Sequence, residues 1–144
     1  MESWRKVWRD GFAPQLSTAG LDALRHALRE DDTRLIQGVT TSPPPIPCLR
    51  EWAVEGACAV AFCAWQGEGF DTVGEVERQF ACTCLDADMA LGEPAACRYF
   101  VNWFDDTPRD QMRRLLLEEV ERTLSERFPI DCAESAIPET IKAA

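Results

Sequence analysis

The stretch REWAVEGACAVAFCAWQGEG, residues 50–69, decides the fold that we expect for this chain. Between Trp52 and Trp65 it is apolar on almost every side, with alanine, valine, phenylalanine and cysteine where a surface helix carries polar residues. A helix that is apolar all round is normally enclosed by other helices. We therefore expect a central helix over about 51–66, around which the other helices pack.

Helical patterns lie on both sides of this segment. Apolar residues recur at helical spacing in the segments 4–12, 17–32, 71–92, 93–106 and 107–128. Thr72 and Glu75 have the spacing of a capping box, and Gly92 follows the last apolar position of that helix. A further single turn is expected at 31–38. No alternating strand pattern and no internal repeat is found, so we predict an all-α bundle of five or six helices.

The length of 144 residues is that of one domain. We expect a single all-α domain over 1–130 and a poorly patterned tail over 131–144. The stretch PPPIP at 43–47 is incompatible with a helix interior or a central strand. It is either a stiff connector that crosses the helix ends or a polyproline ligand for an SH3-like groove, and the sequence leaves both interpretations open.

Composition narrows the classes of partner. The net charge is −10 and the isoelectric point is about 4.5, so the phosphates of nucleic acids and anionic membrane surfaces should repel the chain. The N-terminus lacks the apolar core of a signal peptide, and the longest apolar run, 56–65, is too short to span a bilayer. The seven cysteines fit no disulfide framework. We predict a cytoplasmic protein that binds neither membranes nor nucleic acids.

The cysteine spacings argue against a metal site. Cys82 and Cys84 are two residues apart, which points their side chains about 200° apart on a helix, and Cys58 and Cys63 diverge by about 140°. His26, the single histidine, lies off the leucine stripe of its helix. The other cysteines are isolated in the sequence: Cys48, Cys97 and Cys132. We expect thiols that fill the core, no metal and no cofactor, with Cys82 the most accessible of the helical thiols.

Catalytic patterns are also absent from the sequence. One histidine and one tyrosine leave few partners for a nucleophile, and no phosphate-binding loop or metalloprotease motif is found. Carboxylate pairs occur at helix ends or on polar faces, where acids are common: Asp31–Asp32, Asp105–Asp106 and Glu118–Glu119. We assign no catalytic residue, and the chain is more typical of a protein that is not an enzyme.

Acidic residues are concentrated in one segment. Residues 67–92 contain six acids and a single base, Arg78. Trp103 precedes two further acids and is a candidate for a partly exposed anchor, because tryptophan is enriched at binding hot spots. The candidate partner-binding residues are Glu75, Glu77, Asp86, Asp88, Trp103, Asp105 and Asp106.

We predict a small acidic helical protein that acts by protein–protein interaction, as an adaptor, an inhibitor or an immunity-type partner of a basic surface. The alternative is a small-ligand-binding protein or an enzyme with a pocket between helices. That pocket would be lined by Trp52, Trp65 and Tyr99 with a thiol nearby.

Overall fold

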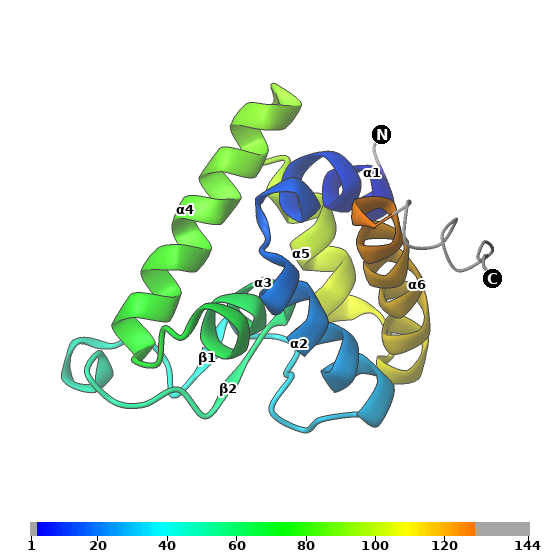
Figure 1. Ribbon diagram of the computed structural model, residues 1–144. Coiled ribbons are helices and arrows are strands. Elements are labelled where there is room, and N and C mark those ends of the chain that lie inside the picture. The colour runs from blue at the N-terminus through cyan, green and yellow to red at the C-terminus, as the bar shows by residue number, and fades with distance from the viewer. Residues whose placement is uncertain (1–2, 129–144) are drawn as a thin grey trace, which may run out of the picture.

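The computed structural model describes residues 3–128 and confirms the all-α class (Figure 1). The elements are, in order, α1 Trp4–Val7, the π-helical turn η1 Trp8–Phe12, the 3₁₀ turn η2 Ala13–Gln15, α2 Thr18–Glu30, β1 Thr41–Ser42, the 3₁₀ turn η3 Pro47–Leu49, β2 Gly56–Ala57, α3 Ala59–Phe62, the π-helical turn η4 Cys63–Gly67, α4 Val73–Leu91, α5 Cys97–Asp106 and α6 Arg109–Arg127. No helix among these is both long enough and apolar enough to cross a membrane.

Side-chain caps fix the ends of the helices that the sequence predicted best. The Ser17 hydroxyl accepts a hydrogen bond from the Gly20 N–H at 2.9 Å and begins α2. Thr72 and Glu75 form both halves of the predicted capping box at the start of α4. Gly92, at φ 71°, ends that helix in the left-handed region, where glycine costs least.

The central helix begins later than the sequence indicates. It runs from Ala59 through η4 to Gly67, and its residues 59–64 are buried as expected. The expected start at 51 is wrong, because residues 51–58 form a loop and β2. The backbone of β2 pairs antiparallel with β1 and also bridges to Leu35. Val54, Ala57 and Cys58 are buried without a helix, whereas Trp52 and Ala53 are exposed, and composition alone does not predict this difference.

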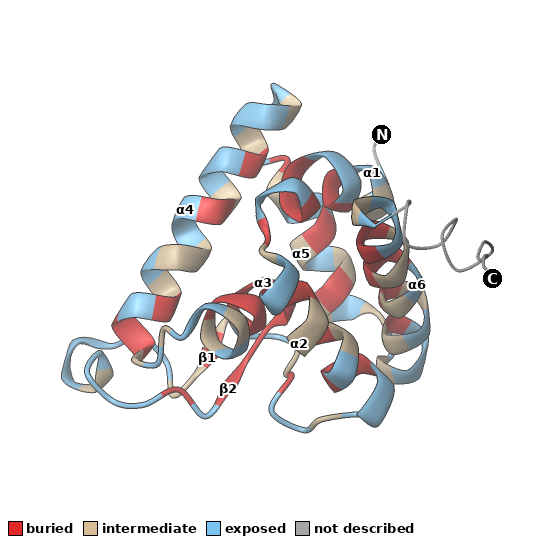
Figure 2. Ribbon diagram, in the orientation of Figure 1, coloured by how far each residue is buried: buried red, intermediate tan, exposed pale blue. Residues whose placement is uncertain are grey.

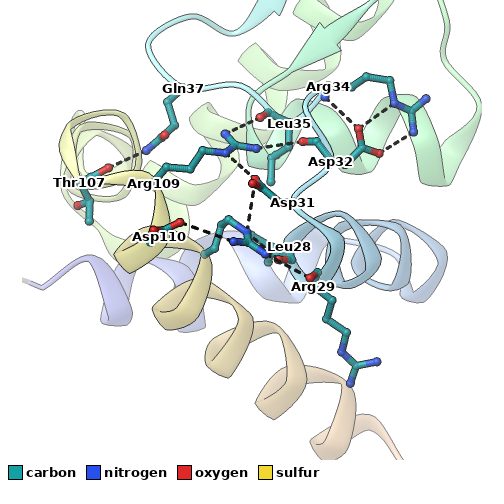
Figure 3. A network of polar contacts seen from close by, with 11 residues as sticks. Leu28, Arg29, Asp31, Asp32, Arg34, Leu35, Gln37, Thr107, Arg109 and Asp110 are labelled. Carbon is teal, nitrogen blue, oxygen red and sulfur yellow. Dashed lines mark hydrogen bonds and ion pairs between the residues drawn. The ribbon is translucent and has the colours of Figure 1, made fainter.

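The single turn expected at 31–38 is present as one hydrogen bond, from the Leu35 N–H to the Asp32 carbonyl at 3.1 Å, but no helix forms there. The Ile36 N–H donates to the Ala57 carbonyl at 2.9 Å, which holds this loop against β2. Figure 3 shows how Arg109 of α6 secures it: its guanidinium donates to the Asp31 carboxylate at 2.7 Å and to the Leu35 carbonyl at 2.9 Å. A third hydrogen bond reaches the Asp32 carbonyl at 3.0 Å. The loop is therefore held by tertiary contacts that no local pattern predicts.

Two helical segments cross at unusually short range. A Cβ placed on Gly67 of η4 would lie 2.2 Å from the Gly20 Cα and 2.4 Å from the Gly20 nitrogen of α2. Neither position can carry a side chain without moving backbone. The glycine pair therefore sets the distance between α2 and the central helix.

An aromatic cluster joins α5 to the N-terminal helices. Phe100 of α5 is buried, and its ring centroid lies 5.3 Å from those of Trp8 and Phe12 and 6.3 Å from that of Trp4. Trp4 in turn stacks on Trp103. These contacts hold α5 in the core, and Phe100 also lines the cavity described below.

The pair Glu118–Glu119 of α6 was expected on a polar face, and for Glu119 this expectation is wrong. Only Glu118 is exposed, whereas Glu119 is buried and accepts hydrogen bonds from Arg5 at 2.7 Å and from Arg9 at 2.8 and 2.9 Å. Burial raises the pKa of Glu119, but the hydrogen bonds from Arg9 and Arg5 outweigh it and hold this pKa below its ordinary value. The carboxylate thus ties α6 to α1 and η1.

Candidate functional site

Four of the acids predicted to bind a partner are hydrogen-bonded within the fold. Glu75 belongs to the capping box of α4, and Glu77 accepts a hydrogen bond from the Thr41 hydroxyl at 2.6 Å. The Asp88 carboxylate accepts from the Ala95 and Cys97 N–H groups and so fixes the turn before α5. Asp105 accepts from the Gly38 N–H at 2.9 Å. Sequence position alone does not distinguish such acids from free ones.

The remaining predicted residues lie in two places. Asp86 and Asp106 are exposed, and within residues 3–128 neither makes a hydrogen bond or an ion pair. Trp103 is half-buried, and its ring stacks on Trp4 at 3.6 Å with an angle of 7° between the planes. Of the six acids among the candidates, Asp86 and Asp106 are thus the two without a hydrogen bond or ion pair in the described part of the chain.

A different face of α4 is open. Leu85 and Met89 are 60% and 73% exposed, four residues apart on the helix, and Cys82 and Asp86 beside them are exposed as well. We call these four residues the outer face of α4. The opposite side of the same helix carries Ala87, which is buried against η1. Figure 2 shows the C-terminal half of α4 mostly exposed, and in Figure 1 its end reaches beyond the other helices.

A cavity of about 380 Å³ lies on the inner side of α4. Its walls come from the start of α3, from Phe80 and Cys84 of α4, from one side of α5 and from the loop at 38–40. Its lining includes the exposed residues Val39 and Arg98, so it opens to the surface. This volume is within the range of small-molecule sites.

The pocket that the sequence suggested is not this one. Trp52 and Tyr99 are exposed, Trp65 is half-buried, and none of the three lines the cavity. The aromatic lining comes from phenylalanines instead. Cysteines also form part of its wall.

Three cysteines that the sequence separates line this cavity together: Cys58, Cys84 and Cys97. The thiols of Cys84 and Cys97 influence each other's pKa, although one belongs to α4 and the other begins α5. Burial raises the pKa of Cys58 to about 12, and it also raises the pKa values of Cys84 and Cys97. These thiols are neutral at pH 7, so they are poor nucleophiles and form a soft apolar wall.

Within residues 3–128, no group of three or more histidine, cysteine, aspartate or glutamate side chains is arranged to hold a metal ion. Cys132 lies outside the described residues. His26 is exposed and solvated, as its position on the helix predicts.

Alkylation of the native protein should separate the thiols by their surroundings. Cys82 is exposed on the outer face of α4, whereas Cys58 and Cys63 are buried with raised pKa values. We expect Cys82 to react with iodoacetamide at least about tenfold faster than Cys58 or Cys63, because the thiolate must be both formed and reached. Timed labelling read by mass spectrometry measures this, and exposed Cys48 is the positive control. Faster labelling of Cys58 or Cys63 would contradict the helix register described here.

Comparison with known proteins finds no family model, no curated protein and no solved structure that matches this chain.

Proposed function

We propose that this protein binds another protein through the outer face of α4, defined above as Cys82, Leu85, Asp86 and Met89. The observation that carries the proposal is the exposure of Leu85 and Met89 at helical spacing on the open half of a 19-residue helix. Two large apolar side chains on one exposed stripe are the anchors by which a helix enters an apolar groove.

Charge selects the kind of partner. The chain has a net charge of −10, and Asp86 on the outer face has no counter-ion within the described residues. Two copies of α4 packed against each other would bring like charges together, which disfavours self-association through this face. The partner that fits is a different protein, with an apolar groove and lysine or arginine on its rim.

Removing the two anchors should abolish capture of such a partner. We expect the double variant Leu85→Ser, Met89→Ser to bind at least about tenfold more weakly than the wild type, since central apolar anchors dominate interface energy. The measurement is affinity capture from the cell extract of the source, followed by titration of the captured protein against both forms. Binding should also weaken as salt rises, because screening reduces the attraction between acid and base.

The matched control is Ile46→Ser, which removes an exposed apolar residue from the proline-rich stretch. Retained capture by this control and loss by the α4 variant would support the proposal. Loss with Ile46→Ser alone would assign docking to residues 43–47 and overturn it. A stable dimer that the α4 variant dissolves would overturn it as well, because the occupant would then be a second copy.

A further inference from the structure

We infer that the cavity between α3, α4 and α5 binds an elongated apolar molecule that carries a carboxylate at one end and an ammonium group at the other. This inference is independent of the outer face of α4. The cavity uses Phe80 and Cys84 on the inner side of that helix, whereas the outer face points away from it.

The ligand class follows from one stripe of α5. Arg98, Val101, Asn102 and Asp105 all line the cavity, and their spacing of three, four and seven residues places them along one side of the helix. The cation Arg98 therefore lies at one end of this wall of the cavity, and the acid Asp105 lies at the other end. With a rise of 1.5 Å per residue, the two charges are separated by about 10 Å along the helix axis.

The wall between the two charges is largely apolar. Val101 lies between them, and Phe80, Val60 and the thiols of Cys58 and Cys84 face the same space. Because these thiols are neutral, an uncharged chain or ring is what this part of the cavity favours.

Both charged groups are available to a ligand. The carboxylate of Asp105 accepts one hydrogen bond, from Gly38 to Oδ1, so Oδ2 has no partner within the described residues. Arg98 makes no ion pair with any described side chain. Two opposite charges that are near an apolar cavity but not paired with each other fit a molecule that bridges them.

An ω-amino acid of suitable length, 8-aminooctanoate, is the probe. Isothermal titration at pH 7 compares it with octanoate, octylamine and octanol, which lack one or both charged ends, and with 4-aminobutanoate, which is too short to bridge. We expect 8-aminooctanoate to bind at least about tenfold more tightly than each of the other four, because only it satisfies both ends. Equal affinity for 8-aminooctanoate and octanol, or no saturable binding of any probe, would overturn the inference.

Single substitutions test which residue binds the carboxylate of the probe and which binds its ammonium group. Arg98→Gln should remove the advantage of 8-aminooctanoate over octylamine, and Asp105→Asn its advantage over octanoate. The asparagine keeps an acceptor for the Gly38 N–H, so the fold should be retained. Asp106→Asn, an exposed neighbour that does not line the cavity, is the control and should bind like the wild type. An effect of Asp106→Asn equal to that of Asp105→Asn would overturn the assignment.

A labelling experiment on the wild type locates the bound probe without any substitution. Saturating 8-aminooctanoate should slow the alkylation of Cys97, which lines the cavity, and leave that of Cys82 unchanged. Unchanged labelling of Cys97 in the presence of bound probe would place the probe elsewhere and overturn the inference.

Discussion

Gly67→Ala is expected to destabilise the protein by about 3 kcal/mol or more, at the upper end of the cost of overpacking. The new Cβ would lie 2.2 Å from the Gly20 Cα, far inside van der Waals contact. The atoms that it meets belong to the backbone of α2, which cannot swing aside as a flexible side chain could. Relief therefore requires α2 and η4 to separate, and the contacts around the central helix would be lost with them.

Urea unfolding followed by circular dichroism measures this effect as a lower midpoint, or as a variant that does not fold. Gln66→Ala is the matched control, because it changes the exposed neighbouring residue and adds no atom to the crossing. The control should stay within about 0.5 kcal/mol of the wild type. A Gly67→Ala variant as stable as the control would show that the two helices cross at a greater distance than described here.

The parts of the fold that the sequence predicted correctly are those specified by local chemistry. The boundaries of α4 follow from a capping box at Thr72 and Glu75 and from a left-handed glycine at Gly92, all within the helix or next to it. The helical period along 71–92 also predicted its buried side, including Ala87. Such signals depend only on neighbours a few residues away.

The start of the central helix depends on distant partners. Residues 51–58 include apolar residues like those of the helix that follows, but β2 pairs with β1 and with Leu35. Strands of two residues are too short to show alternation. Composition predicted burial from Trp52 onwards, whereas Trp52 and Ala53 are exposed, and the tertiary pairings of Ala57 make its segment a strand and not a helix.

In the candidate site, too, features set by one helix were predicted from the sequence, and features set by contacts between helices were not. Exposure of Cys82 follows from the helical wheel and is confirmed. The contact between Cys84 and Cys97 joins two helices across a turn that the Asp88 carboxylate holds, and spacing rules that consider one helix at a time cannot reveal it. The acids of 67–92 were predicted as one surface, but several of them are hydrogen-bonded within the fold. Their composition therefore predicts the charge of this region correctly, whereas the outer face of α4 is defined by its exposed apolar residues.

The buried acid of α6 leads to the second large effect. Glu119→Gln is expected to cost about 2 kcal/mol at pH 7, the typical contribution of hydrogen bonds to a charged group. The side chain of Glu119 is 3% exposed, whereas the side chains of its partners Arg5 and Arg9 are 35% and 39% exposed. Water can therefore solvate the arginines again, which keeps the cost below that of a fully buried pair with one partner removed.

The pH dependence of unfolding shows whether Glu119 stabilises the fold by its charge or by its packing. Because the pKa of Glu119 is lower in the folded protein than its ordinary value of 4.5, ionisation of this group stabilises the fold above that value. The stabilisation is lost as the pH falls through the folded pKa, where wild-type Glu119 becomes neutral like glutamine. The stability difference between wild type and Glu119→Gln should therefore be constant from pH 7 to about 5.5 and shrink as the pH falls below 4.5.

Urea titrations at several pH values measure this difference directly. Glu118→Gln is the control, since its carboxylate is exposed and the substitution should change stability by less than about 0.5 kcal/mol at any pH in the range. A difference for Glu119→Gln that is the same at pH 3 and pH 7 would mean that the shape of the side chain, and not its charge, holds α6 against α1 and η1. If the unfolding free energies of wild type and Glu119→Gln converge in acid, the contact of Glu119 with Arg5 and Arg9 depends on charge. Acid then weakens this contact within the folded protein, because its strength depends on an ionised carboxylate in a site that excludes water.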